Sequence, residues 1–397
     1  MSEVLLKDIT ELIVDCPHST AYDEGKGFPL VRTPNIGKGR LIYSGMHRVS
    51  EEVYNQRNAR AVPQKDDLIF AREATAGNVA LIQKDEKVCL GQRTVLIRPD
   101  KSKVNPAYLT YTLLAPKQQY NLLSTANGAT VAHVNLPTIR NLKLDIPNIE
   151  TQHRIASILS RYDSLIENYQ KQIKLLEEAA QRLYKEWFVD LHFPGHENTK
   201  IVDGVPEGWE KNVMEEIAEI NKRNIPKNYE YSFVNYTDLG NVRLGRMDNP
   251  IRYNYGEEPG RAKRVAIDGD IIWGMVRPNL KSYALVQYPK EQDVFSTGFA
   301  VLTAKRVPFS FLYCYVTTEA FVGYLVNCTN GAAYPAVKPE HFSRAELILP
   351  SNNIMDMFND MVEPMFRRIG KYQSQIRLLT EARDRLLPKL MSGEIAV

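Results

Sequence analysis

Apolar residues recur with a heptad period along residues 150–188, and this feature constrains the fold more than any other. The period near 3.5 residues predicts a long helix that pairs with another helix along one apolar seam. A helix with one such seam is unstable alone in water, so it needs a partner. The seam has two sets of positions: Ile155, Tyr162, Tyr169, Leu176 and Leu183, and, four residues after each of these, Leu159, Ile166, Ile173, Ala180 and Trp187.

The partner lies in the same chain, 203 positions further on. Gln-Ile-Lys-Leu-Leu at 172–176 returns there as Gln-Ile-Arg-Leu-Leu at 375–379. Only Arg383, which stands where the first stretch has Ala180, interrupts the second seam. For either stretch alone, plain core packing would also explain the pattern, but the repeat favours two paired helices. The second seam consists of Phe358, Val362, Met365, Ile369, Tyr372, Ile376, Leu379, Leu386 and Leu390.

The same offset of 203 relates the stretches that precede the two helices. Between the copied blocks the halves differ, for example at 72–87 compared with 275–291. A repeat of this length indicates a duplicated domain with a shared scaffold and different loops. The copied pairs are 36–41 and 239–244, 67–70 and 270–273, Asn-Gly-Ala at 127–129 and 330–332, and Ile-Pro at 146–147 with Leu-Pro at 349–350.

We therefore predict an α+β protein with two homologous mixed α/β domains, separated by two long antiparallel coiled-coil helices and related by an internal pseudo-two-fold repeat. The predicted segments are a first domain at 1–149, a first long helix at 150–190, a linker at 191–209, a second domain at 210–351, a second long helix at 352–390 and a tail at 391–397.

Local patterns predict the elements inside these segments. Short runs of branched residues predict strands, and proline at a first turn predicts a helix start. Proline inside the second long helix predicts a kink or a fresh start at Pro364 and the helix end at Pro388. The expected strands are at 68–71, 79–82, 94–97, 141–146 and 346–349, and near Val234, Ile271 and Val301; the expected helices are at 4–14, 106–114, 116–123 and 213–220, and after Pro308.

Composition sets the outer limits. A chain of 397 residues with 44% hydrophobic and 24% charged residues fits two or three globular domains. The net charge of +3 permits nucleic-acid binding without requiring it. The four cysteines lie far apart and form no CxxC motif, which indicates a reducing compartment. With neither a leader pattern nor an apolar run of membrane-spanning length, we expect a cytoplasmic protein that does not contact a membrane.

Motifs of catalysis are missing or weak. The sequence has neither a G-x-x-x-x-G-K-[ST] loop nor a G-x-G-x-x-G turn after a strand. Asn-Pro-Ala-Tyr at 105–108 resembles the N-P-P-Y of amino-methyltransferases but lacks its second proline, and a helix start explains it better. His192 and His196 straddle Pro194-Gly195, so they do not share a helical face. Since a duplicated enzyme would repeat its catalytic groups, we predict recognition, with no catalytic or metal-binding residue.

The whole layout resembles the specificity subunit of Type I restriction–modification enzymes. The paired Asn-Gly-Ala and Ile-Pro blocks carry this resemblance, together with Leu-Tyr-Lys-Glu-Trp-Phe at 183–188 and Pro-Glu-Gly-Trp at 206–209. Gly298-Phe299 and 276–280 are also similar to the target-recognition domains of that family. The resemblance covers essentially the whole chain.

The resemblance implies a non-catalytic subunit that gives a restriction enzyme and adenine methyltransferase its DNA specificity. Each globular domain would read one half of a bipartite double-stranded DNA target. The paired helices would fix the spacer between the half-sites and dock two methyltransferase subunits, and two motor-nuclease subunits would join them. S-adenosylmethionine, ATP and Mg would belong to those partners, while this chain would bind no cofactor.

Candidate DNA contacts are polar residues at matching loop positions, because Arg, Lys, Asn and Gln read base edges and hydroxyls or amides bind phosphates. Arg72 and Arg277 lead the set, since each follows a copied strand. Asn127 and Asn330 also fit a plain Asn-Gly turn, and Arg40 and Arg243 fit a solvated surface as well as a phosphate contact. The candidates are Asn35, Lys38, Arg40, Arg72, Thr75, Asn78, Asn127, Thr130 and His133 in the first half, and Asn241, Arg243, Arg277, Asn279, Lys281, Asn330 and Tyr334 in the second.

Two other functions remain open at this point. One is a specificity subunit of a modification system without a Type I motor, which genome neighbours or co-purification would distinguish. The other is a coiled-coil adaptor that binds protein instead of DNA. Salt-dependent binding to DNA would distinguish a specificity subunit from an adaptor, because an adaptor should not show it.

Overall fold

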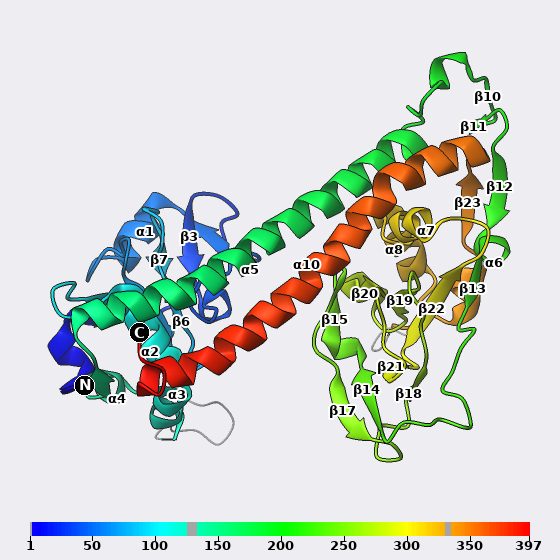
Figure 1. Ribbon diagram of the computed structural model, residues 1–397. Helices are drawn as coiled ribbons and strands as arrows, with labels where there is room; N and C mark the ends of the chain where they lie inside the picture. The colour runs from blue at the N-terminus through cyan, green and yellow to red at the C-terminus, as the bar shows by residue number, and fades with distance from the viewer. Residues whose placement is uncertain (1, 125–132, 330–334) are drawn as a thin grey trace. The chain divides into compact units, whose positions relative to one another are not determined.

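The computed structural model describes residues 2–124, 133–329 and 335–397 (Figure 1). Its contacts divide the chain into two units. The first unit is Met1–Glu167 with Ile376–Val397, and the second is Asn168–Gln375. Each unit contains one globular domain and a segment of each of two long helices, α5 (Ile149–Tyr184) and α10 (Asn352–Ser392). A π-helical turn, Lys185–Val189, continues α5.

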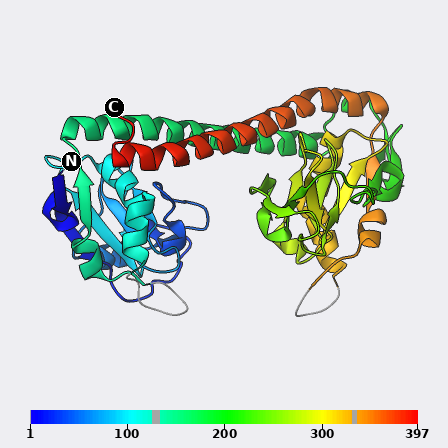
Figure 2. The same cartoon turned by 60° about the horizontal axis from the view of Figure 1, so that its bottom comes forward.

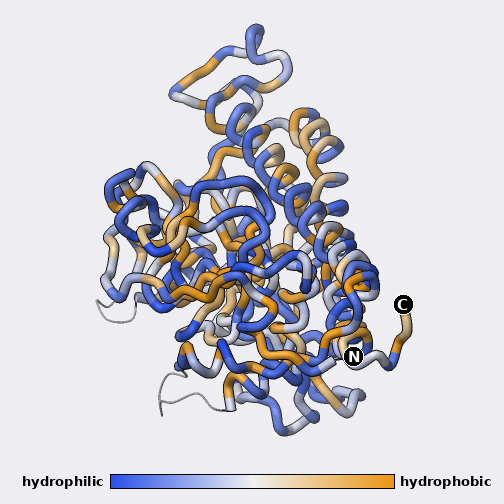
Figure 3. The backbone as a smooth tube through the Cα atoms, turned by 90° about the vertical axis from the view of Figure 1, so that its left-hand side faces the viewer, coloured by the Kyte–Doolittle hydropathy of each residue, from blue (hydrophilic) through white to orange (hydrophobic). Residues whose placement is uncertain are grey.

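The two long helices pair through the predicted seam. All of its positions on both helices are buried or half-buried, and the tube in Figure 3 shows apolar and polar residues alternating along them. In the first unit Asp163 on α5 contacts Arg383 on α10, while the earlier Leu159 shares a core with the later Leu390. In the second unit the Tyr169 ring stacks on Tyr372, with 4.8 Å between centroids. The predicted antiparallel pairing is therefore confirmed.

The end of α10 differs from the prediction at its prolines. The helix is uninterrupted through Pro364, without the fresh start that we considered, and it runs past Pro388 to Ser392. An internal proline costs about 3 kcal/mol. Burial of Leu390, which is 2% exposed in the core of the first unit, offsets that cost. Figure 2 shows this end of α10, in red, lying against helices of the first unit.

The globular domain of the first unit has a four-stranded antiparallel sheet in the order β2-β8-β5-β6, with α2 and α3 packed on one face. A three-stranded sheet, β4-β3-β7, and the pair β1-β9 complete it. The bounds are β1 Ser2–Leu5, β2 Thr10–Asp15, β3 Phe28–Val31, β4 His47–Val49, α1 Glu51–Arg57, β5 Leu68–Ala71, β6 Val79–Leu81, β7 Cys89–Leu90, β8 Thr94–Pro99, α2 Pro106–Leu114, α3 Pro116–Leu123, α4 Leu136–Arg140 and β9 Lys143–Ile146.

The helix predicted at 4–14 is wrong. The segment contains β1, the 3-10 turn Leu6–Ile9 and β2. Leu6, Ile9 and Ile13 are spaced like a helical stripe and are indeed buried. Their backbone groups nevertheless bond to distant strands, since β1 pairs with β9 and β2 with β8.

The second unit repeats this plan. Its main sheet has the order β13-β22-β19-β20, a second sheet has the order β17-β14-β21-β18, and β12 pairs with β23. The helix predicted at 213–220 is shorter in the structure, where only α6 is helical and strands β12 and β13 directly flank it. The bounds are β10 Ile201–Val202, β11 Val205–Pro206, β12 Glu210–Val213, α6 Met214–Ile217, β13 Ala218–Ile220, β14 Phe233–Thr237, β15 Val242–Arg243, β16 Arg246–Met247, β17 Ile251–Asn254, β18 Ala262–Arg264, β19 Ile271–Gly274, β20 Tyr283–Leu285, β21 Asp293–Ser296, β22 Phe299–Ala304, α7 Phe309–Val316, α8 Glu319–Asn327, α9 Pro339–Ser343 and β23 Glu346–Leu349.

In the described part of the chain, no single helix is both long and apolar enough to cross a membrane. The bent pair α7 and α8 reaches that length and composition only when the two helices are taken together.

An aromatic cluster joins α10 to the second domain, and it generates a prediction. Phe358 is fully buried, with its ring 4.9 Å from Phe188 and 6.4 Å from Phe311. Phe358→Ala should lower the free energy of unfolding of the second unit by about 3–5 kcal/mol, because the substitution removes a buried ring with its contacts and leaves a cavity. All three tryptophans lie in this unit, so tryptophan fluorescence during urea unfolding measures it specifically.

The control for Phe358→Ala is Met361→Ala on the same helix. Met361 is 49% exposed, so its truncation should change the free energy of unfolding by less than about 0.5 kcal/mol. Equal losses for the two variants would contradict the packing described for Phe358.

Candidate nucleic-acid interface

The two domains share one joint between a core strand and the segment that follows the Asn-Gly block. The backbone N–H of Val134 donates to the carbonyl of Arg72 at 3.0 Å, and the N–H of Val337 donates to the carbonyl of Met275 at 2.9 Å. Both partners are related by the offset of 203. The same joint is thus built twice, directly after β5 and after β19. Four of the predicted DNA contacts, Asn127, Thr130, Asn330 and Tyr334, lie outside the described residues.

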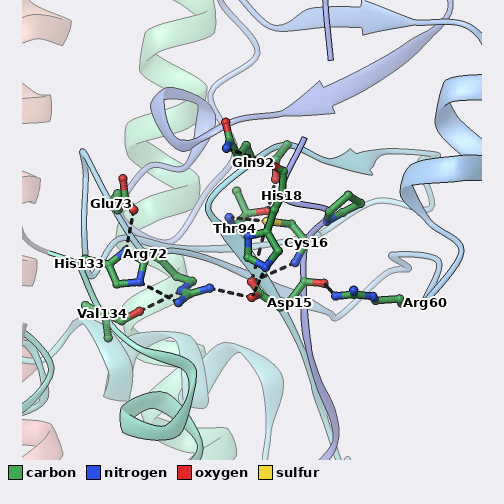
Figure 4. Close-up of polar contacts among 12 residues, drawn as sticks. Asp15, Cys16, His18, Arg60, Arg72, Glu73, Gln92, Thr94, His133 and Val134 are labelled. Carbon is green, nitrogen blue, oxygen red and sulfur yellow. Dashed lines mark hydrogen bonds and ion pairs between the residues drawn. The ribbon is translucent and has the colours of Figure 1, made fainter. Parts of the chain in front are cut away.

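Arg72 is held inside the first domain (Figure 4). Its Nε donates to the carbonyl of Val134 at 2.9 Å, and its Nη1 lies 2.7 Å from the Asp15 carboxylate. Only 9% of the side chain is exposed. The guanidinium is therefore engaged in internal bonds, and we withdraw Arg72 from the candidate base contacts.

His133 extends the same network. Its Nε2 lies 2.8 Å from Nη2 of Arg72, and its Nδ1 lies 2.6 Å from the Glu73 carboxylate. Because Arg72 can only donate and the carboxylate only accepts, the imidazole fits as the neutral tautomer with its proton on Nδ1. Arg93 pairs with Glu73 at 2.8 Å and closes the network. The second domain has apolar residues at the corresponding places, where Met275 and Ala336 replace Arg72 and His133.

Three further candidates in the first domain donate hydrogen bonds to backbone carbonyls of residues 33–42. The amide of Asn35 donates to the carbonyl of Ile42 at 3.1 Å, and Asn35 is 1% exposed. Thr75 donates to the carbonyl of Thr33 and Asn78 to that of Ile36, both at 2.9 Å. These part-buried bonds satisfy backbone carbonyls of the loop, so the three side chains shape the loop that carries the remaining candidates.

Lys38 and Arg40 stand at the surface of that loop. Arg40 pairs with Glu167 on α5 at 3.1 Å and also bonds Gln83, so it ties the loop to the helix. Lys38 is exposed. Of the candidates described in the first domain, Lys38 is the one whose charge is free to meet a phosphate.

In the second domain the candidates Arg277, Asn279 and Lys281 come together on one short turn. The 3-10 turn Pro278–Leu280 is flanked by Arg277 at φ 49° and Lys281 at φ 54°. Residues other than glycine rarely adopt this left-handed region, and such strain concentrates at functional sites. Arg277 and Asn279 are exposed. The backbone N–H of Arg277 donates to the carbonyl of Pro335, so the turn leans on the repeated joint.

A hairpin supports this turn from one side. The N–H of Leu244, between β15 and β16, donates to the carbonyl of Lys281 at 3.0 Å. The hairpin carries Arg243, which is exposed, while Asn241 caps the preceding turn by accepting from the N–H of Asp238. Lys281 pairs with Glu319 on α8. The turn and hairpin together present arginine and amide groups in a fixed geometry, which suits contacts with base edges and phosphates.

Three exposed basic residues of the second domain were not among the candidates predicted from the sequence: Arg252, Arg261 and Lys263. Within the residues that the structure describes, none of them forms an ion pair with a carboxylate. Arg252 stacks over the ring of Phe233, 3.5 Å from its centroid, on the edge strand β17. The run Arg-Ala-Lys-Arg at 261–264 was the available signal, and it favours additional phosphate contacts.

The chain matches known proteins along nearly its full length. Residues 2–178 match the family model of the Type I restriction modification DNA specificity domain. The Type I restriction enzyme MjaIX specificity subunit of Methanocaldococcus jannaschii is 26% identical over 99% of this chain and 93% of its own length. The HindI specificity subunit of Haemophilus influenzae is 23% identical over 85% of this chain and 88% of its own length.

A solved structure agrees in fold. The S subunit of a Type I restriction–modification system from M. genitalium has a TM-score of 0.60 at 16% identity, and the match covers 98% of this chain and 95% of that one. This likeness shows that the two chains share a fold. Residues 2–178 thus match the DNA specificity domain of Type I restriction–modification systems, and nearly the full chain is similar to specificity subunits of those systems. The matches favour neither a different kind of modification system nor a non-DNA adaptor.

The Arg72 network predicts a local loss of stability. Arg72→Ala leaves the carboxylate of Asp15, whose side chain is 14% exposed, without its arginine, and only the exposed His18 remains as an ion-pair partner beside it at 3.3 Å. Breaking a buried pair in this way costs about 3 kcal/mol or more. Circular dichroism should show earlier unfolding of the first unit, while the tryptophan transition of the second unit stays in place. A variant with unchanged stability would return Arg72 to the candidate DNA contacts.

The Arg277 turn predicts a loss of binding. Arg277→Ala should weaken binding of target DNA by about 1–3 kcal/mol if the guanidinium makes a bidentate base contact. Fluorescence anisotropy at several salt concentrations measures the effect. The control is Lys211→Ala, which removes an exposed charge from β12 of the same domain. Wild-type affinity and specificity in the Arg277 variant would remove it from the interface.

Proposed function

We propose that each globular domain of this specificity subunit reads one half of a bipartite double-stranded DNA target. The observation that carries this proposal is the joint built twice, where the bond between Val134 and Arg72 recurs between Val337 and Met275. The scaffold behind the joint repeats, whereas the exposed residues beside it differ between the domains. Two readers with one frame and different surfaces would recognise two different half-sites.

The paired helices would set the spacer between the half-sites. Each of them is continuous over more than thirty residues, and a helix rises about 1.5 Å per residue. A rod whose apolar seam must stay in register can change length only by whole heptads, so it can act as a ruler.

The same helices offer duplicated docking positions. Leu175 on α5 is 64% exposed, and its counterpart Leu378 on α10 is 53% exposed. Exposed leucines repeated at equivalent positions suit two identical partners. We assign these positions to two methyltransferase subunits, and loss of co-purification after Leu175→Glu would agree with that assignment.

The catalysis would belong to partner subunits. The methyltransferase subunits would bind S-adenosylmethionine and methylate adenine, and two motor-nuclease subunits would use ATP and Mg. This chain would contribute specificity without binding a cofactor. The complex would work in the cytoplasm, and the four unpaired cysteines suit a reducing compartment.

A methylome tests the proposal directly. The chain is co-expressed with its neighbouring methyltransferase subunit in a host without adenine methylation, and modified adenines are located by long-read sequencing. The expected result is a split motif with a fixed gap. If both proteins are soluble and associated but no new methylation arises, two-domain reading of DNA is contradicted.

Domain replacement should change half of the motif. When residues 210–350 are exchanged for the second domain of another family member, the methylome should keep one half-site and acquire a new other half. The reason is that each domain carries its own exposed reading surface. A motif altered in both halves would contradict independent reading.

Helix insertion should change the gap. One extra heptad near Gln172 in α5, with the matching heptad near Gln375 in α10, lengthens both helices while the seam stays in register. The methylated motif should keep its half-sites and gain a longer spacer. An unchanged spacer with full activity would contradict the ruler.

A further inference from the structure

A buried ion pair joins the two long helices in the first unit. Nη1 of Arg383 on α10 donates to Asp163 on α5 at 2.7 Å, and the hydroxyl of Tyr111 on α2 donates to the same carboxylate at 2.5 Å. The side chains of Asp163 and Arg383 are 7% and 18% exposed. Burial raises the pKa of Tyr111, so its phenol remains a donor. Arg383 is the residue that interrupts the apolar seam.

The corresponding place in the second unit is apolar. Phe366 on α10 stands where α5 has Asp163, and Ala180 on α5 stands where α10 has Arg383. Tyr313 on α7 stands five residues after Pro308, as Tyr111 stands five residues after Pro106, and the Phe366 ring packs edge-on against Tyr313 at 5.0 Å. Ala180 and Phe366 are 0% and 2% exposed. The contact between the two long helices is therefore charged in the first unit, and its equivalent in the second unit is apolar.

A second acid makes this difference larger. Glu177, one turn before Ala180 on α5, lies beside Tyr313 and Phe366 in a small cavity of the second unit. Burial raises the pKa of Glu177 to about 6. The position that corresponds to Glu177 on α10 is Thr380. Helix α5 thus brings a carboxylate to this contact in both units, whereas α10 brings Arg383, whose neighbour Asp384 pairs with it from the exposed side of the helix.

Copied helices can pair in unintended ways, since α5 could meet α5 of a second copy, and α10 could meet α10. An α5–α5 pair would place Glu177 and Ala180 of one copy against Asp163 of the other, so two carboxylates would meet without an arginine. An α10–α10 pair would bury Arg383 against Phe366 and leave it only the 59% exposed Asp384 as an ion-pair partner. Because a pair of identical antiparallel helices has two-fold symmetry, each of these unfavourable contacts would occur twice. A buried charge without its partner is strongly destabilising, and single polar residues in helix seams select partners in this way.

We propose that the Asp163–Arg383 pair selects α10 as the partner of α5 and excludes homotypic pairing with a second copy of this chain. The connection within one chain adds a high effective concentration, which favours pairing inside the chain over exchange between chains. This proposal is independent of DNA recognition. It explains why a charge interrupts an otherwise apolar seam at one of two equivalent positions.

The stacked tyrosines supply a probe. Tyr169 on α5 packs on Tyr372, its own counterpart on α10, so an α5–α5 pair would bring Tyr169 opposite Tyr169 of the second copy. Tyr169→Cys is introduced into the full chain together with Cys328→Ser, because the other three cysteines are buried. Under oxidising conditions a disulfide-linked dimer then reports homotypic pairing. The double variant with Tyr372→Cys should form an internal disulfide and shows that the position is reactive.

The double substitution Asp163→Phe with Arg383→Ala gives the helix contact of the first unit the two apolar residues that the second unit has at the equivalent positions. In this background the fraction of disulfide-linked dimer should rise at least about tenfold, which corresponds to 1.4 kcal/mol. The control exchanges the charges, Asp163→Arg with Arg383→Asp, and should stay as free of dimer as the unaltered pair. No increase in the folded apolar variant, or equal dimer in all backgrounds, would overturn the proposal.

A second measurement applies if the apolar variant does not fold. Two differently tagged full chains are co-expressed, one with Asp163→Arg and the other with Arg383→Asp. Within each chain, positions 163 and 383 carry like charges. When α5 of one chain pairs with α10 of the other, the two positions carry opposite charges again. The two chains should co-purify at least about ten times more than two wild-type copies. Co-purification at the wild-type level would overturn the proposal.

Discussion

The seam between α5 and α10 is the interaction on which the rest of the structure depends. Each unit takes a segment of both helices, and the first unit is for that reason not a continuous stretch of chain. Leu390 of α10 enters the core of the first unit, and Phe358 enters the aromatic cluster of the second. Loss of the seam would therefore remove packing from both domains as well as from the helices. The candidate DNA contacts are thus supported by packing that lies outside them.

The duplicated scaffold accepts opposite chemistry at equivalent positions. The joint after β5 uses Arg72 and His133, while the joint after β19 has Met275 and Ala336. A buried ion pair and apolar groups of similar volume often contribute nearly equal stability. Equivalent positions can thus diverge without loss of the fold, and a polar residue in one copy need not face the ligand.

Features with a local cause were predictable from the sequence. The heptads placed both helices, and α2 begins at Pro106 because Asn105 caps the first turn by accepting from the N–H of Tyr108. Features set by distant partners were not. The segment 4–14 fits a helical stripe, yet its strand partners lie far along the chain. Arg72 was a candidate DNA contact because the linear sequence does not show Asp15 as its neighbour, whereas exposure keeps Arg277 among the candidates.

The division of the chain into units has a consequence for its biosynthesis. The first unit is completed by Ile376–Val397, so a ribosome must make the whole second unit before the first domain meets its last helix. Until then the apolar face around Ile155 and Leu159 stays uncovered on the nascent chain, where it is open to aggregation or to a chaperone. Translation that stops before residue 376 would leave that face permanently exposed. Quality control could then recognise an incomplete chain by its first domain, although every residue of that domain had been made.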